Sequence, residues 1–290
     1  MENFSNAILE LIKKTSCVLP EDVKTRIRIA YDQEDDDTPA KNALLEILTN
    51  IDIAEQKSLP LCQDTGTNYF IISYPYNMDF SLIKEKVVSS VIKATESYYL
   101  RPNSVDSLTG KNSGDNTGPG HPSIDLIPVK NDYIEVKLML KGGGCENMGM
   151  QYSLPDDTID AGRDIKGIKK VILNSVLLAQ GYGCAPGILG VCIGGDRADS
   201  LKAAKKELFK NLDFTNPDSE LAAIESEIFQ KSNLLGIGPM GYGGKTTLLG
   251  LHITKLNRIP ASFFVSISYM CWACRRRTLK YYPDGRFEID

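Results

Sequence analysis

Short β-type runs and amphipathic helices are interspersed along the whole chain, and this pattern most constrains its fold. Alternating residues at 134–140 predict a half-buried strand, and the apolar run 187–195 predicts a fully buried one. Apolar residues at helical spacing predict helices at about 40–55, 84–98 and 165–180. Regular βαβ units are not visible. We therefore expect a mixed α/β (α+β) fold, with twisted β-sheets surrounded by helices.

The remaining segments complete this expectation. Further predictions are helices at 198–212 and 221–231, a β-type run at 261–271, a terminal hairpin closed by the turn 282–285, and an acidic surface loop at 34–37. The stretch Arg101–Pro122 is rich in Gly, Asn, Ser, Thr and Asp and is expected to be a long loop that is either functional or disordered. Because repeats and low-complexity linkers are missing, we expect a single catalytic domain over 1–290, helical at about 1–60.

Charge and hydropathy narrow the functional classes. A net charge of -4 argues against binding to nucleic acid, which requires a concentrated positive face. Apolar runs stay well short of the ~20 residues that span a bilayer, and the N-terminus lacks the pattern of a secretory signal. We therefore expect a cytoplasmic protein without a membrane partner. The basic run Arg275–Arg277 is either a solvated strand end, an interface rim or an anion-binding site.

Five of the seven cysteines fall into two groups. Cys17 and Cys192 lie in apolar patterns and are expected to be small buried hydrophobes. Cys62, Cys184 and Cys271 lie at the ends of predicted elements, beside glycine or polar residues, where a side chain can enter a cleft. Three thiolates from remote segments can bind iron, whereas an electron-transfer cluster normally has four cysteine ligands. A cluster with three would leave one iron open to act as a Lewis acid.

Three short motifs match other functional classes incompletely. Gly236–Gly241 has the dinucleotide pattern G-x-G-x-x-G but follows a predicted helix, and Pro239 interrupts it. Gly244-Lys245-Thr246 resembles the end of a P-loop, yet Pro239 stands where that pattern requires glycine, so only a generic anion-cradling loop remains. The C-x-x-C at Cys271–Cys274 ends a β-run instead of opening a helix, which disfavours a thiol–disulfide enzyme.

Six segments of the chain occur in the same order as in one known family. They are P-L-C-Q-D-T-G-T at 60–67, the loop that runs from N-S-V-D at 103–106 to T-G-P at 117–119, K-G-G-G-C-E-N at 141–147, C-A-P-G at 184–187, G-I-G-P-M-G at 236–241 and C-W-A-C-R-R at 271–276. With these segments the chain resembles the alpha subunit of class I, iron–sulfur-dependent fumarate hydratase and its relative L-tartrate dehydratase. The resemblance covers nearly the whole chain.

The resemblance implies a [4Fe–4S] cluster with one iron that the protein does not ligate. The cluster ligands would be Cys62, Cys184 and Cys271. Gln63 and Asp64 would lie beside that iron, Arg101 would clamp a substrate carboxylate, and the backbone of Gly144 would approach the substrate. A guanidinium fork suits bidentate carboxylate binding, and removal of a carbon-bound proton needs a base such as Asp64. The alternative for Asp64 is a turn residue that bonds its own backbone.

Several positions depart from the family pattern. Ile259 stands where many relatives have a substrate-binding histidine, which bears on the choice of substrate. Cys145 replaces a frequent serine, and Cys274 a common aspartate or histidine. His121 lies in the long loop and is either a substrate contact or a surface residue, whereas His252 lies in a helix-like segment and is expected to be packed.

The sequence thus predicts a hydro-lyase alpha subunit that hydrates fumarate reversibly to (S)-malate. Its expected partners are a small dicarboxylate substrate and a separate beta subunit in an alpha/beta heteromer, because single-chain relatives continue into a second domain. The first alternative is an L-tartrate dehydratase alpha subunit, which forms oxaloacetate. The second alternative is a non-catalytic cysteine metalloprotein, although structural zinc sites typically use closely paired cysteines.

Overall fold

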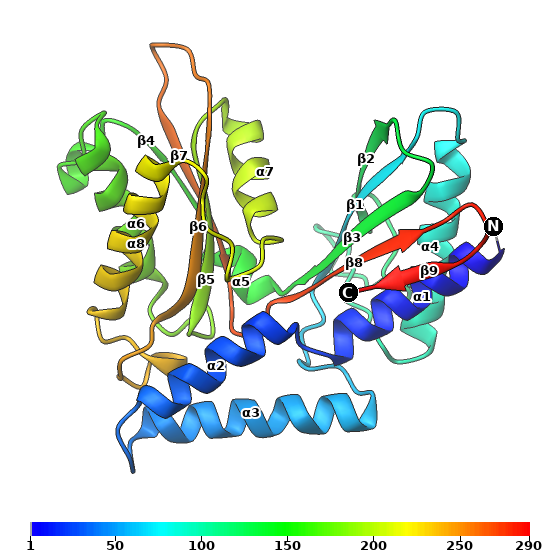
Figure 1. The fold of residues 1–290 in the computed structure, drawn as a ribbon, viewed down its shortest axis with the longest axis horizontal. Helices are drawn as coiled ribbons and strands as arrows, with labels where there is room; N and C mark the ends of the chain where they lie inside the picture. The colour runs from blue at the N-terminus through cyan, green and yellow to red at the C-terminus, as the bar shows by residue number, and fades with distance from the viewer. Residues whose placement is uncertain (1) are drawn as a thin grey trace. The chain divides into compact units, whose positions relative to one another are not determined.

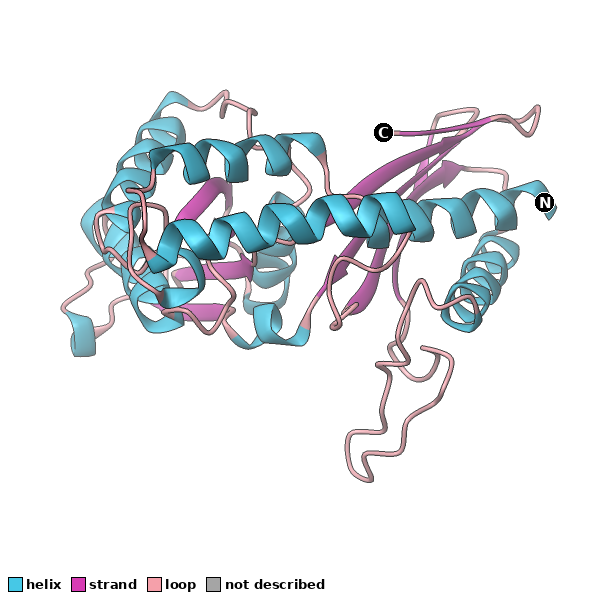
Figure 2. Cartoon of the chain, turned by 90° about the horizontal axis from the view of Figure 1, so that it is seen from below, coloured by secondary structure: helices cyan, strands magenta, loops and turns pink. Residues whose placement is uncertain are grey.

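The computed structural model describes residues 2–290 and divides into two compact units, each made of separated segments. The first unit comprises the segment up to Pro20, Thr49–Gly143 and Ala273–Asp290. The second comprises Glu21–Leu48 and Gly144–Trp272. Helices and strands are interspersed along the chain and form two mixed sheets (Figures 1 and 2). This confirms the predicted α+β fold class.

The first unit is built on a five-stranded sheet. Its strands, in spatial order, are β2 (Ser123–Val129), β1 (Thr67–Pro75), β3 (Ile134–Lys141), β8 (Arg275–Tyr281) and β9 (Phe287–Ile289). Strands β1 and β2 are parallel, and the other neighbours are antiparallel. Helices α1 (Glu2–Cys17) and α4 (Phe80–Glu96) share one apolar core with the sheet, to which Leu11, Val91 and Val136 contribute (Figure 1).

The second unit is built on a four-stranded sheet with helices on both faces. Its strands, in spatial order, are β4 (Met150–Ser153), β7 (Phe264–Met270), β5 (Gly187–Gly194) and β6 (Leu248–Leu256). Its longer helices are α2 (Glu21–Gln33), α6 (Ile165–Ala179), α7 (Arg197–Glu207) and α8 (Ser219–Asn233), and its 3-10 turns are η1 (Asp157–Ile159) and η2 (Pro239–Gly241). Helices α6 and α8 lie on one face of the sheet and α7 on the other (Figure 1).

The chain passes between the units at four points, and two of these fall within helices, in α3 (Pro39–Lys57) and the short α5 (Gly143–Asn147). Helix α7 lies close to its sheet. A Cβ on Gly190 of β5 would be only 2.1 Å from the carbonyl oxygen of Ala204 in α7, so a residue without a side chain is needed there. No helix among residues 2–290 combines the length and apolar character that a membrane span requires.

Most predicted elements are present, with differences at their ends. Helix α4 begins four residues before the predicted start, because the Asp79 side chain caps it by accepting the N–H of Ser81 at 2.8 Å. Helix α7 ends at Glu207, five residues early, since the chain then continues through single turns at Phe209 and Lys210. The helix-like assignment of His252 is wrong: the residue is buried in β6.

The entry into β1 depends on a glycine. Gly66 has a φ of +74°, and a Cβ there would lie 2.4 Å from the backbone carbonyl of Lys141. Thr67 and Lys141 are register partners at the start of the β1–β3 pairing. The turn that carries Cys62 can therefore lie against the end of β3 only because residue 66 has no side chain.

We expect Gly66→Ala to lower the free energy of unfolding by at least about 2 kcal/mol, because backbone strain and a backbone clash coincide. Gly110→Ala is the matched control, since its φ is +67° and a Cβ there meets nothing within 4 Å. It should cost roughly 1 kcal/mol from the dihedral angle alone. Denaturant unfolding of both variants measures the difference, and equal losses would contradict the clash.

Candidate active site

The carboxylate of Asp64 connects two backbone segments of the first unit. Its Oδ1 accepts the N–H of Gly66 at 2.9 Å, which is the turn geometry considered for this residue. Its Oδ2 accepts the N–H of Gly143 at 2.7 Å. A Cβ on Gly142 would lie 2.9 Å from the same Oδ2, so the glycine-rich segment leaves room for the carboxylate. Asp64 is therefore a turn residue and also a link to the segment before Gly144.

Arg101 is held beside this turn through its backbone. The buried Oγ1 of Thr65 accepts the N–H of Arg101 and an N–H of the Asn103 side chain, each at 3.1 Å. The side chains of Arg101, Asp64 and Gln63 are exposed. The first unit thus places the backbone of Arg101 beside the turn that carries Asp64.

The long loop after α4 is ordered by one buried amide. The loop spans the predicted stretch 101–122 and contains no helix or strand (pink in Figure 2). The Asn116 side chain accepts the N–H of Asn103 at 2.7 Å and donates to the Thr95 hydroxyl at 2.9 Å and the Arg101 carbonyl at 2.8 Å. These bonds fix the backbone of Arg101 relative to α4. The loop also lines a pocket of about 690 Å³, to which His121 contributes.

The second unit places three cysteines around Tyr269. Cys184 lies between α6 and β5, and its carbonyl accepts the N–H of Trp272 at 3.4 Å. Cys271 follows β7 directly, and its N–H donates to the sulfur of Cys145 at 3.3 Å. Burial raises the pKa of Tyr269, and negative charge on Cys271, Cys145 and Cys184 raises this pKa further. The segment that follows β7 thus bonds both Cys184 and Cys145 through its backbone N–H groups.

The Cys184 turn is shaped around the Tyr269 ring. A Cβ on Gly183 or on Gly187 would lie 2.3 Å from atoms of that ring. Cys184 itself is exposed and has a φ of +54°, which is rare for a residue with a side chain and is typical of functional sites. Tyr269 was missed in the sequence because it lies within an unbroken β-type run.

Cys17 and Cys192 are buried, as the sequence predicts; Cys271 is also buried, whereas Cys184 is exposed. Desolvation by burial raises the pKa of Cys17 and of Cys192 to about 11, so both are core residues with inert thiols. Cys62 is half-buried and belongs to the first unit, whereas Cys184 and Cys271 belong to the second. Within either unit alone, the described residues include no group of three His, Cys, Asp or Glu side chains that could hold a metal ion.

These environments fit an iron–sulfur cofactor in the chemistry of the donors. Cys184 and Cys271 adjoin the same phenol, lie at element ends, and are thiols, the ligands that iron–sulfur clusters use. The third cysteine of the predicted set, Cys62, belongs to the first unit.

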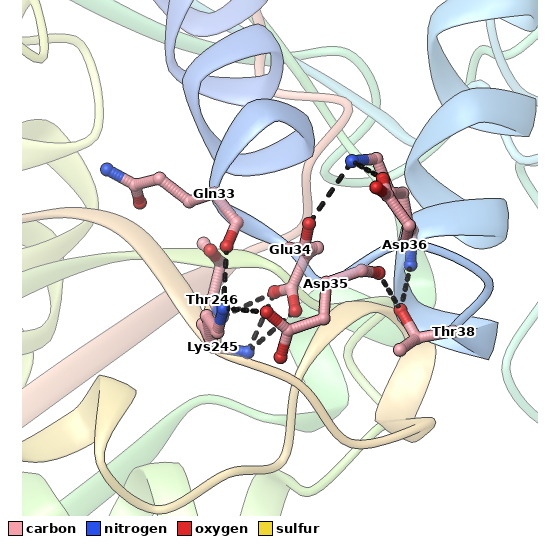
Figure 3. Close-up of polar contacts among 8 residues, drawn as sticks. Gln33, Glu34, Asp35, Asp36, Thr38, Lys245 and Thr246 are labelled. Atoms are coloured by element: carbon pink, nitrogen blue, oxygen red, sulfur yellow. Dashed lines mark hydrogen bonds and ion pairs between the residues drawn. The ribbon is translucent and has the colours of Figure 1, made fainter.

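A glycine-rich loop in the second unit binds a carboxylate of the chain itself. The Oε1 of Glu34, at the end of α2, accepts the N–H groups of Lys245 and Thr246 at 2.7 and 3.0 Å (Figure 3). The Lys245 ammonium donates to the carbonyl of Gln33 at 3.0 Å and pairs with Asp35. Glu34 is buried, so its assignment to a surface loop was wrong, because its partners follow about 210 residues later.

This loop also holds the Cys184 turn. The Met240 N–H donates to the Ala185 carbonyl at 2.8 Å, and the Gly187 N–H donates to the Thr247 carbonyl at 2.9 Å. The loop follows α8 and leads into β6, so it lacks the strand-to-helix context of a dinucleotide site. As predicted, it cradles an anion; that anion is Glu34.

Comparisons with known proteins identify the family to which the chain is similar. The sequence model of the family described as fumarate hydratase (fumerase) matches residues 5–280. A protein of Geobacillus stearothermophilus, provisionally named a class I fumarate hydratase, is 48% identical over 287 residues, which cover 98% of this chain and 56% of that protein. The chain thus spans little more than half the length of this relative.

Two further relatives are similar to the chain over nearly their whole length. A protein of Methanocaldococcus jannaschii, provisionally named L(+)-tartrate dehydratase subunit alpha, is 38% identical over 97% of this chain and 99% of its own length. The L(+)-tartrate dehydratase subunit alpha of Escherichia coli K12 is 28% identical over 98% of this chain and 93% of its own length. All three names describe hydro-lyases. The chain belongs to the fumarate hydratase (fumerase) family.

We expect Glu34→Ala to loosen the loop at 236–247, because two backbone N–H groups lose their acceptor, at a cost of about 1–3 kcal/mol. Hydrogen exchange at the amides of Lys245 and Thr246 should become faster. Asp35→Ala is the matched control, since it removes an exposed ion pair with Lys245, worth about 0–1 kcal/mol. Equal acceleration in both variants would show that the buried carboxylate does not anchor the loop.

Cysteine alkylation of reduced, cluster-free protein should follow burial and pKa. Cys184 is exposed and should react first at pH 8, whereas Cys17 and Cys192 should react last, because few of their thiols are ionised and both are buried. Peptide mass spectrometry over time measures the order. Modification of Cys192 as fast as Cys184 would contradict these environments.

Proposed function

We propose that the chain is the cluster-bearing alpha subunit of an iron–sulfur hydro-lyase that hydrates fumarate reversibly to (S)-malate. The observation that carries this proposal is the Asp64 carboxylate, which is fixed by the N–H groups of Gly66 and Gly143, two residues after Cys62 and beside the backbone of Arg101. Family membership and the 48% identity to a protein provisionally named fumarate hydratase support the same reaction.

The proposed cofactor is a [4Fe–4S] cluster ligated by Cys62, Cys184 and Cys271, with one iron that no protein residue ligates. When bound, the cluster would supply a Lewis acid at the hydroxyl group that leaves as water. This ligand set rests on the family resemblance and on the thiol environments of the two units.

The residues of the chain would bind the substrate and move a proton. The exposed guanidinium of Arg101 is a planar fork suited to one substrate carboxylate. Asp64 would take the proton from the substrate carbon during dehydration and return it during hydration, since its orientation is fixed by two N–H donors. The amide of Gln63 would orient the substrate, and the backbone at Gly144 would approach it.

The proposal includes a beta subunit and a small dicarboxylate substrate. The Methanocaldococcus and Escherichia relatives are named as alpha subunits, and the longer Geobacillus relative extends beyond the matched region. An alpha/beta heteromer in the cytoplasm agrees with these names and with cysteines that function as reduced thiols.

L-tartrate is the second candidate substrate. The observation in its favour is that two relatives matched along nearly their whole length carry the tartrate dehydratase name. Ile259 is exposed, so the side chain at this position is available to influence the choice between the two hydroxy acids. The ratio of kcat/KM for malate and for L-tartrate decides between them.

Anaerobic reconstitution with iron, sulfide and the beta subunit should give fumarate absorbance from malate. Asp64→Asn should lower kcat by about 10²–10⁴-fold, because the base is lost, while Arg101→Lys should mainly raise KM, because the bidentate contact is lost. Asp284→Asn, an exposed aspartate in the terminal hairpin turn, should change neither parameter. Lack of turnover on any 2-hydroxy dicarboxylate would refute the proposal.

A further inference from the structure

Arg275 is a buried guanidinium near the Cys62 turn. It lies on β8 opposite Leu140 of β3, and only 1% of the residue is exposed. Its Nη2 donates to the backbone carbonyl of Asp64 at 2.9 Å. Its Nε and Nη1 are also buried and have no hydrogen-bond partner within residues 2–290. One of the largest fully buried side chains thus carries a permanent positive charge and makes a single hydrogen bond.

Such an arrangement is costly unless an anion balances the charge. A buried ion loses its hydration, and this loss is compensated only by an opposite charge and by further hydrogen bonds. No carboxylate of the described chain pairs with Arg275, whose one acceptor is a neutral carbonyl. Arg277 on the same strand differs, because it is partly exposed and donates to the carbonyls of Val18 and Asp290.

The position of Arg275 indicates which anion it balances. The guanidinium bonds the backbone of Asp64, two residues from Cys62, and so contacts the turn that carries the proposed ligand. A cluster with three thiolate ligands carries net negative charge, and its sulfurs accept N–H hydrogen bonds. Outer residues of this kind set the affinity of a metal site and its reduction potential.

We propose that Arg275 supplies the buried positive charge that balances an anion at the Cys62–Asp64 turn, and that this anion is the thiolate-ligated cluster. The identity of the anion rests on the proposed function; the charge imbalance at Arg275 does not. Arg275 is a positioning residue, because it acts through the Cys62 turn and through charge. A substrate carboxylate has the same charge and is the competing source.

The test compares Arg275→Met, which removes the charge at similar length, with Arg275→Lys, which keeps it, and with the control Arg277→Met. Without the cluster, Arg275→Met should raise Tm by roughly 2–4 °C, because a buried charge without a balancing anion is removed. After anaerobic reconstitution, the same variant should lose iron and sulfide to a chelator about tenfold faster than wild type. Arg275→Lys should retain more iron than Arg275→Met.

The control Arg277→Met should change Tm of the cluster-free protein in the direction opposite to Arg275→Met. Arg277→Met removes donors from carbonyl acceptors and should lower Tm equally in cluster-free and reconstituted protein, with iron loss unchanged. If Arg275→Met also lowers Tm in both forms and retains iron normally, Arg275 is merely structural and the inference is overturned. If it loads iron normally but raises KM for malate about tenfold, the anion is a substrate carboxylate and the cluster assignment is overturned.

The result also separates this inference from the proposed function. Iron retention that depends on Arg275, in a protein that turns over neither malate nor tartrate, would support the inference and overturn the proposed function. A wild-type chain that takes up neither iron nor sulfide would overturn both. If the wild-type protein turns over malate, and Arg275→Met changes neither iron retention nor KM, the inference is overturned but the proposed function is not.

Discussion

The two hydrogen bonds accepted by Asp64 are the interaction on which the rest of the first unit's site depends. They join the turn before β1 to the segment after β3, two strands that are already paired in the sheet. A glycine at 66 allows this approach. The same turn offers Thr65 as the acceptor that holds Arg101. One short turn therefore fixes the carboxylate of Asp64 and the backbone of Arg101.

The second unit uses the same physical device with a different residue. Glu34 accepts the backbone N–H groups of Lys245 and Thr246, which lie outside any helix or strand of the glycine-rich loop. The loop in turn bonds the backbone on both sides of Cys184 at Ala185 and Gly187. In each unit a carboxylate thus replaces regular secondary structure where a reactive side chain must be presented. The conformation of each of these segments therefore depends on a single carboxylate.

Local sequence patterns predicted the helices and strands and the buried state of two cysteines. Contacts between residues that lie far apart in the sequence could not be predicted from them. The helix at α6 and the strands β3 and β5 follow from apolar spacing within each segment, and so does the packed state of Cys17 and Cys192. Strand β6 was misread because its buried residues form a nearly continuous run without alternation.

The roles of individual polar residues were hidden for a different reason. Glu34 and Arg275 look like ordinary surface charges, and only partners more than 200 residues away show that they are buried. Sequence spacing does not predict such contacts, because the fold sets them.

The interleaving of the two units has a consequence for biosynthesis. Strands β8 and β9 complete the first sheet, yet the ribosome makes them only after the entire second unit. Helix α1 shares its core with that sheet. Part of its apolar face therefore remains uncovered while more than half of the chain is translated. The second unit can fold during translation, and the turn that carries Cys62 gains the support of β8 last.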